Sequence, residues 1–386
     1  MNGAAGRPSD GCAKLSPEII KDTPLVTTIL STIVVLGVLI FVHELGHFLV
    51  AKWSGVTVLR FSFGFGPRLF GFRKGETDYC ISAFPLGGYV KMLGEEPGEE
   101  LPEDQRERSF SSQPVGKRIA IVLAGPLSNF LLAIVVFTLV YAVSGIPEIL
   151  PEVGSVAAGS PAEQGGLQVG DLVISINDKK LETWENLSGT IEHSTEETLV
   201  LKVQRGEETL TLPVKPMVSE AKNLFGETVT RRLIGVTPSG KIQVRKVDPF
   251  LAGYYSLVQT YHLSRLFLLT VVKLIERVVP FHTLGGPILI AQMAGRQAQE
   301  GLLNLIYFIA VISVNLAVLN LLPIPILDGG HILFFTLEAV LGKPIGIRKL
   351  EMAQKVGMVL LLVLMVFVFY NDIMRLIPGH KPDILP

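Results

Sequence analysis

The chain has 386 residues and a formal net charge of -1; 48% of its residues are hydrophobic and only 18% are charged. This apolar composition favours a membrane protein, and the lack of positive charge and of any basic run with interleaved aromatic residues excludes nucleic acid as a partner. Cys12 and Cys80 lie far apart and outside any CxxC pair, so neither a disulfide framework nor redox chemistry is expected.

The first predicted element after an N-terminal tail (residues 1–23) is a membrane span. An uncharged run extends from Pro24 to Val42 and continues as an apolar segment to about Lys52. A spanning helix needs about 20 predominantly apolar residues. The tail lacks the basic, apolar and cleavage-site order of a signal peptide, and the apolar run is too long for one, so the span is expected to be retained.

Two histidines and a glutamate lie near the end of this span, in the sequence HELGH. In a helix His43 and His47 project from the same face, so their imidazoles can bind one zinc ion. Glu44 is then placed to take a proton from water at the metal, as in a metallopeptidase. A pair of structural histidines is the alternative. Titratable residues inside a span cost about 2.5–3.5 kcal/mol each on insertion scales, which favours metal ligation.

The segment 58–92 is predicted to form β-hairpins that enter the membrane. Its apolar residues alternate over short stretches such as Phe61, Phe63 and Phe65, with glycines and Pro67 at turns. A strand edge there could pair with an unwound substrate helix and satisfy its backbone groups. The alternative is an amphipathic cytoplasmic loop packed on the spans.

The second predicted span extends from Ile119 to Pro147 without a charged residue, after the anchoring pair Lys117 and Arg118. Residues 24–147 therefore form the first half of a membrane core.

A more charged segment without long apolar runs follows, and residues 148–216 are predicted to be a soluble β-rich domain. The sequence GSPAEQGGLQVGDLVISINDKKL, from Gly159 to Leu181, gives a turn, a short helix and a strand, and a hairpin turning at Arg205 and Gly206 follows. These residues resemble a PDZ domain of the bacterial type; a generic small β domain is the alternative. PDZ domains bind extended peptides or C-termini by strand addition, so a peptide or a substrate ectodomain is the expected ligand.

Residues 217–300 are predicted to be a linker with amphipathic surface helices. The apolar stretch from Ser256 to Val279 carries five residues that can bear charge, which favours a helix on the membrane surface over a fifth span.

The third predicted span, from Gly301 to Leu327, ends at Asp328 in the sequence NLLPIPILDGGH. Pro323 and Pro325 open the helix, and irregular backbone at membrane depth is tolerated only against protein or a wet cavity. A catalytic zinc usually has three protein ligands, and Asp328 is the preferred third one, with His331 as its rival. An aspartate in a turn outside the membrane is the alternative. The soluble zinc proteases fit poorly, because Trp53 stands where one group has a further histidine.

A fourth span covers Val356 to Tyr370, so residues 301–377 form the second half of the core, before a C-terminal tail (378–386). Four spans bring the ends of the first and third spans to the same membrane face, whereas a fifth would separate Asp328 from the histidines. The predicted fold is an α-helical integral membrane protein with four transmembrane helices, membrane-associated β-hairpins and an inserted β-rich PDZ domain.

Positive charge between the first two spans predicts the orientation, because such loops stay in the cytoplasm. The basic residues of this loop are Lys52, Arg60, Arg68, Arg73, Lys74, Lys91, Arg106, Arg108, Lys117 and Arg118. The predicted active site then lies near the cytoplasmic face of a bacterial inner membrane, and the PDZ domain lies on the periplasmic or extracellular side with both termini.

From about Leu25 to Leu376 the chain resembles the site-2 protease family, and within it the bacterial regulator-of-sigma-E protease type. The likeness rests on HELGH, NLLPIPILDGG, the interposed PDZ domain, FSFGFGPRLF and PLGGYVKM. It implies zinc held by His43, His47 and Asp328, Glu44 as catalytic base, and Asn315 and Asn320 as substrate-binding residues. A single PDZ domain is a departure from members that have two.

The predicted function is therefore zinc-dependent intramembrane endopeptidase activity in regulated intramembrane proteolysis. The expected partners are the lipid bilayer and single-pass transmembrane substrates, such as anti-sigma factors already trimmed outside, or remnant signal peptides. A PDZ-containing membrane scaffold with a non-catalytic zinc site is the main alternative. A zinc transporter is a third hypothesis, which a PDZ domain supports little.

Overall fold

The computed structural model describes residues 24–96 and 101–377, so the predicted tails at 1–23 and 378–386 lie outside the described residues. The helices are α1 (Leu25–Trp53), α2 (Glu103–Arg106), α3 (Val115–Ser144), α4 (Pro161–Gln164), α5 (Trp184–His193), α6 (Pro249–Ile275), the 3-10 helix η2 (Phe281–Thr283), α7 (Pro287–Glu300), α8 (Leu302–Asn320), α9 (Asp328–Leu341) and α10 (Ile347–Leu376). The strands are β1 (Val58–Lys74), β2 (Thr77–Met92), β3 (Ile146–Ile149), β4 (Val153–Val156), β5 (Leu172–Ile176), β6 (Lys179–Lys180), β7 (Leu199–Arg205), β8 (Glu208–Val214), β9 (Met217–Lys222), β10 (Thr228–Leu233), β11 (Val236–Pro238) and β12 (Ile242–Arg245).

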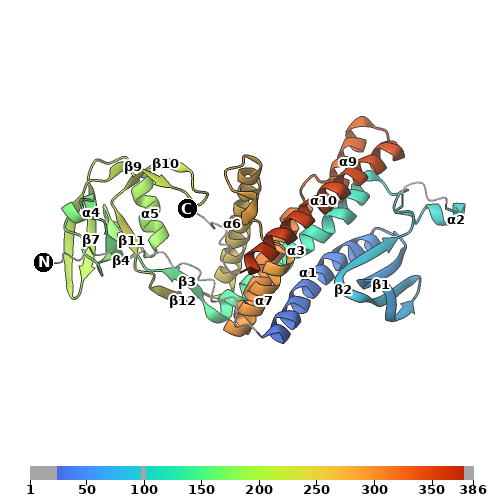
Figure 1. Ribbon diagram of the computed structural model, residues 1–386, viewed down its shortest axis with the longest axis horizontal. Helices are drawn as coiled ribbons and strands as arrows, with labels where there is room; N and C mark the ends of the chain where they lie inside the picture. Colours follow the sequence, from blue (N-terminus) through green and yellow to red (C-terminus); the bar gives the residue numbers. More distant parts are fainter. Residues whose placement is uncertain (1–23, 97–100, 378–386) are drawn as a thin grey trace.

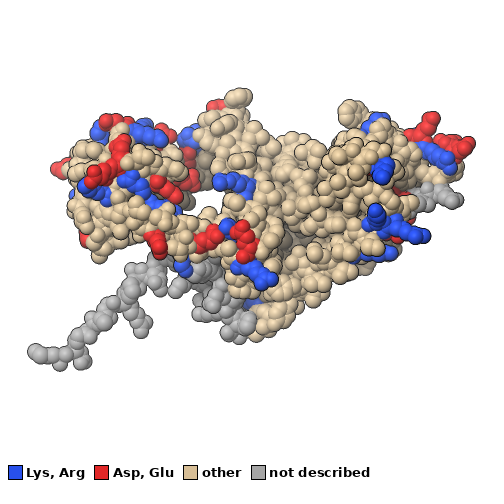
Figure 2. Space-filling view, turned by 90° about the horizontal axis from the view of Figure 1, so that it is seen from above, with Lys and Arg blue, Asp and Glu red and all other residues tan. Residues whose placement is uncertain are grey.

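Four helices of the described chain, α1, α3, α8 and α10, are long and apolar enough to cross a membrane. This confirms the prediction of four candidate spans. In Figure 1 these helices occupy the middle of the molecule, with the strands β3 to β12 at one end and the β1–β2 hairpin with α2 at the other. Charged side chains gather mainly towards the two ends, and much of the surface between them is uncharged (Figure 2), as expected where the surface faces lipid.

Helices α1 and α3 pack at unusually short range because glycine lies at their contact. A Cβ atom on Gly46 of α1 would lie 2.3 Å from Ser128 Oγ and 2.4 Å from the carbonyl oxygen of Ala124, both on α3. Only glycine allows this approach. Small residues are the usual means of close packing in lipid, where helices gain little from hydrophobic burial against each other.

Two further helices, α6 and α7, pack on this core. Helix α6 is not among the candidate spans and contributes Ala252 to an apolar cluster with both of these helices. Helix α7 packs against α1, where a Cβ atom on Gly295 would lie 2.5 Å from Thr28 Oγ1. The backbone N–H groups of Gly286, Ile288 and Leu289 at the start of α7 donate to the carboxylate of Asp372 at 3.0, 2.9 and 3.1 Å. This buried carboxylate joins α10 to the core.

The long strands β1 and β2 fold into a sheet of four segments. Residues 60–63 of β1 lie between residues 78–81 and residues 88–91 of β2, and residues 68–74 of β1 pair with residues 77–82. In this register residues 88–92 form one edge of the sheet. A Cβ atom on Gly88 would lie 3.1 Å from Glu44 Cγ, so this edge lies alongside α1 at the glutamate of HELGH.

Strands β3 to β12 form a separate β-rich unit around its own apolar core. A four-stranded sheet has the order β6-β5-β7-β8. The core contains Val173 and Leu201 of this sheet and Leu187 of α5. The predicted domain ends at residue 216, with a linker beyond it. In the structure β11 pairs with β4, and β12 pairs with β3, so the unit extends to Arg245. Because β3, β4, β11 and β12 have only three or four residues each, their alternation is too short to reveal the pairing.

A largely buried ion pair joins the two halves of the membrane core. Arg118, at the start of α3, donates from Nη1 and Nη2 to Glu338 of α9 at 3.2 and 2.6 Å. The two side chains are 13% and 17% exposed, and the guanidinium lies 4.8 Å from the ring centroid of Phe335. Paired hydrogen bonds of this geometry fix the orientation of one helix relative to the other.

We expect Glu338→Gln to destabilise the protein by about 1.5–3 kcal/mol, because it leaves the Arg118 guanidinium buried without its anionic partner. The Tm of the purified protein in detergent measures this effect. Glu300→Gln, which breaks an exposed pair with Arg296, is the control and should change the Tm little. Equal Tm values for the two variants would contradict a stabilising role for the buried pair.

Candidate metal centre

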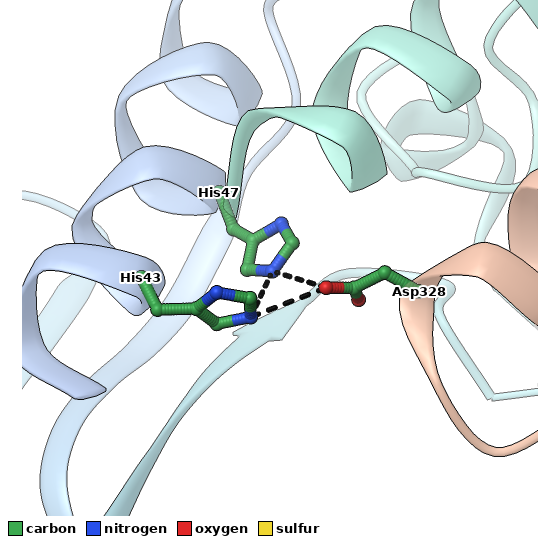
Figure 3. Close-up of side chains that lie close together, drawn as sticks. All are labelled: His43, His47 and Asp328. Atoms are coloured by element: carbon green, nitrogen blue, oxygen red, sulfur yellow. Dashed lines mark hydrogen bonds and ion pairs between the residues drawn. The ribbon is translucent and has the colours of Figure 1, made fainter. Parts of the chain in front are cut away.

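His43, His47 and Asp328 converge on one point between α1 and α9 (Figure 3). The Nε2 atoms of the two histidines are 3.2 Å apart. Asp328 Oδ2 lies 3.2 Å from Nε2 of His43 and 3.6 Å from Nε2 of His47. In the described part of the chain these three residues form the one group of at least three His, Cys, Asp or Glu side chains that could hold a metal ion.

The spacing of these atoms fits zinc. Ligands at 2.0–2.2 Å in a tetrahedron lie roughly 3.3–3.6 Å from one another, close to the three distances observed. The side chains are 11%, 12% and 19% exposed, in the same order. Asp328 Oδ2 is buried and has no hydrogen-bond partner, although it faces both imidazoles. A cation among the three atoms satisfies the carboxylate and both nitrogen lone pairs.

Asp328 is placed by a tight reversal of the chain after α8. Pro323 and Pro325 prevent the helix from continuing, and α9 begins at Asp328. A Cβ atom on Gly329 would lie 2.3 Å from the carbonyl oxygen of Leu321, and one on Gly330 would lie 2.2 Å from that of Ile324. The DGG sequence therefore lets α9 start directly against the turn.

The Asp328 side chain is ionised, as metal binding requires. Burial favours the neutral acid and would raise its pKa, but the neighbouring His43 and His47 imidazoles outweigh burial and hold the pKa below its ordinary value.

Helix α3 shapes the other side of the centre. A Cβ atom on Gly125 would lie 2.2 Å from His47 Nε2 and 2.8 Å from His43 Cε1, so only glycine fits beside the two rings. The carbonyl oxygen of Ile121 lies 2.9 Å from His47 Nδ1 and accepts its proton. This bond points Nε2 of His47 at the metal position.

The remaining predicted residues have separate positions. Glu44 follows His43 on α1, and its Cγ lies 3.1 Å from the position that a Cβ atom on Gly88 of β2 would take. His331 lies one turn after Asp328 and is not part of the metal group. Asn315 and Asn320 are half-buried on α8, and their role in substrate binding stays a prediction.

Sequence reasoning missed the residues that surround the ligands. These are Gly46, Gly125, Asn129 and the backbone carbonyl of Ile121. The sequence AGPLSNF, residues 124–130, offers a signal, because it places Gly, Pro and Asn together inside an uncharged span.

Comparison with known proteins agrees with this site. Residues 31–364 match the family described as Peptidase family M50. The chain belongs to this family, the site-2 proteases. The match includes the HELGH sequence and Asp328, and it confirms the resemblance inferred from these motifs.

Relatives match along most of their length. The chain is 34% identical over 423 residues to the zinc metalloprotease RasP of Geobacillus kaustophilus, with 90% of this chain and 98% of that protein covered. It is 31% identical over 426 residues to RasP of Oceanobacillus iheyensis, with 91% and 99% covered. A protein of Mesorhizobium japonicum, whose name also contains the words zinc metalloprotease, is 37% identical over 364 residues, with 90% and 98% covered. The protein is a zinc metalloprotease and an integral membrane protein.

Gly125→Ala should abolish stoichiometric zinc binding, because its Cβ would lie within 3 Å of both imidazole rings. Zinc content per purified protein, measured by atomic absorption, tests this. Gly116→Ala is a matched control on the same helix, where an added Cβ meets nothing within 4 Å, and it should retain full zinc. Retention of one zinc per chain by Gly125→Ala would show that the rings tolerate the methyl group.

Proposed function

We propose that this protein is an intramembrane endopeptidase that hydrolyses peptide bonds within transmembrane segments, near the cytoplasmic face. The observation that carries the proposal is the convergence of His43, His47 and Asp328 beside Glu44, with the two histidines inside a helix long and apolar enough to span a membrane. Substrates that reach such a site are themselves embedded in the membrane. Membrane-bound anti-sigma factors already trimmed outside, or remnant signal peptides, are the substrates we propose for regulated intramembrane proteolysis.

Glu44 is the proposed general base. Zinc, when bound, polarises the scissile carbonyl and lowers the pKa of the attacking water. Glu44 is adjacent to His43 in the chain and lies beside Gly88 of β2. From there its carboxylate can accept the proton of the water and donate it to the leaving amine. Neither step requires another titratable residue.

The sheet edge formed by residues 88–92 is the proposed site of substrate pairing. A peptide bond in a helix is shielded, so a substrate helix must unwind before attack, and its freed N–H and C=O groups then need partners. Strand addition at an edge supplies them. This edge lies beside Glu44 through Gly88, which would place the paired strand next to the base. Asn315 and Asn320 on α8 are proposed to hold the opposite side of the substrate.

We infer that the β-rich unit is a PDZ domain on the periplasmic or extracellular side of a bacterial inner membrane. Its four-stranded sheet and the helices α4 and α5 support this assignment. In Figure 1 it lies at the opposite end of the spans from β1 and β2, whose loop carries the basic residues that favour the cytoplasm. A peptide or a substrate ectodomain is its proposed ligand.

Glu44→Gln should retain zinc and lose at least about 10²-fold of the cleavage rate, because it keeps the size of the side chain but cannot accept a proton. Mass spectrometry of membrane peptides is the measurement: uncut segments should accumulate with Glu44→Gln and disappear with the unchanged protein. Glu300→Gln, at an exposed acid paired with Arg296, is the matched control and should cleave normally.

The same experiment separates the protease from a scaffold with a non-catalytic zinc site. A scaffold predicts identical membrane peptides in cells carrying either protein. Full cleavage by zinc-loaded Glu44→Gln would refute Glu44 as the base, and loss of zinc from this variant would place Glu44 among the ligands.

The orientation can be tested by cysteine labelling in a protein with Cys12→Ser and Cys80→Ser. Glu207→Cys lies in the exposed β7–β8 turn, and Asp104→Cys lies on exposed α2. A membrane-impermeant maleimide should label Glu207→Cys in intact spheroplasts and label Asp104→Cys only after lysis. The reverse pattern would place the metal centre near the outer face.

A further inference from the structure

The two metal-binding histidines each have a second ring nitrogen, and both of these nitrogens face α3. Nδ1 of His47 contacts the carbonyl oxygen of Ile121 at 2.9 Å. Nδ1 of His43 contacts the side-chain amide of Asn129, whose Nδ2 lies at 3.3 Å. Asn129 is completely buried, at 0% exposure. One helix therefore supplies a polar partner to both imidazoles.

Chemistry settles which atom of the amide must face His43. A neutral imidazole that binds zinc through Nε2 carries its proton on Nδ1, and this N–H must donate to an acceptor. The Nε2 atom of His43 is the one that faces Asp328 and His47. The amide Nδ2 has no lone pair to accept a hydrogen bond, whereas the amide oxygen Oδ1 can accept one.

The amide oxygen is also the atom in need of a partner. Asn129 Oδ1 is buried and has no hydrogen bond, and an unpaired buried acceptor costs about 1–3 kcal/mol. A half-turn of the planar amide exchanges the positions of its oxygen and nitrogen with little change in shape. Oδ1 then accepts the Nδ1 proton of His43, so one rotation gives both the histidine N–H and the amide oxygen a hydrogen-bond partner.

We propose that Asn129 is a positioning residue of the zinc site: its amide oxygen accepts the Nδ1 proton of His43, which fixes the ring orientation and the tautomer that presents Nε2 to the metal. Asn129 contacts neither water nor substrate in this role. It acts on His43 as the Ile121 carbonyl acts on His47. The inference rests on the zinc site alone and is independent of which substrates are cleaved.

The backbone of Asn129 is itself held in place. Ser313 of α8 is fully buried, and its Oγ donates to the carbonyl oxygen of Asn129 at 2.8 Å. The amide therefore lies at the junction of α1, α3 and α8. Ser313 also provides a control, because its hydroxyl contacts the backbone of Asn129 and leaves the amide free.

The test measures zinc affinity of the full chain, purified with zinc in detergent, by competition with a chelator of known affinity. Asn129→Leu and Asn129→Ala both remove the acceptor but differ in volume, whereas Asn129→Asp keeps an oxygen at the same place. We expect both acceptor-free variants to raise the zinc Kd by about 10- to 100-fold, as outer partners of metal-binding histidines usually do. Asn129→Asp should bind zinc at least as tightly as the unchanged protein.

Two controls separate positioning from packing. Ser313→Ala should lower the Tm and leave the zinc Kd unchanged. In the cobalt-substituted protein, the visible absorption band, which reports ligand geometry, should change in Asn129→Leu and persist in Ser313→Ala. If Asn129→Leu and Asn129→Ala fold and keep a zinc Kd within twofold of the unchanged protein, or if Asn129→Asp binds as weakly as they do, the proposal is wrong.

Discussion

The metal centre depends on how closely two membrane helices approach each other. Gly46 of α1 and Gly125 of α3 lie where any side chain would collide with the facing helix or with the histidine rings. In lipid, helix pairs are held by close packing and interhelical hydrogen bonds more than by hydrophobic burial. The glycines provide the packing, and the contacts of His43 and His47 with α3 provide the hydrogen bonds. The same contact thus assembles the helix pair and orients both ligands.

The third ligand comes from the opposite half of the chain and needs its own support. Helix α9 begins at Asp328, and Arg118 of α3 forms an ion pair with Glu338 near the other end of that helix. Both ends of α9 are thereby fixed relative to α3. The first end shares the metal position with two histidines that contact α3, and the other end forms the ion pair with Arg118. Because ligands on separate elements must be held before an ion can bind them together, metal affinity and the packing of the two halves are coupled. Zinc should therefore add to the stability of the whole membrane core.

The sequence predicts the parts of this arrangement that are local or chemically costly. Four spans follow from uncharged length, and the i, i+4 histidines follow from helical spacing. Asp328 stands out because a carboxylate directly after a span interrupted by prolines is costly unless it has a role such as metal binding. The supporting contacts cannot be predicted in this way. The Ile121 carbonyl is a backbone group that every residue has, so the sequence does not mark it. The role of Gly125 becomes visible only once the crossing of α1 and α3 is known. Strands β11 and β12 escape prediction for a related reason, since their partners β4 and β3 lie about 80 to 100 residues earlier in the chain.

The polarity of the site explains why it sits on irregular and glycine-rich segments. Two imidazole nitrogens and a carboxylate oxygen within 3.2–3.6 Å of one another do not stabilise a fold by themselves, because each loses water on burial and all three are hydrogen-bond acceptors in the zinc-binding tautomer. Their proximity has to be imposed by the scaffold: by the DGG turn for Asp328, and by the α1–α3 contact for the histidines. The bound cation offsets the unfavourable free energy of bringing these three atoms together. The rigid packing around the site is therefore needed mainly to hold the metal ligands in place.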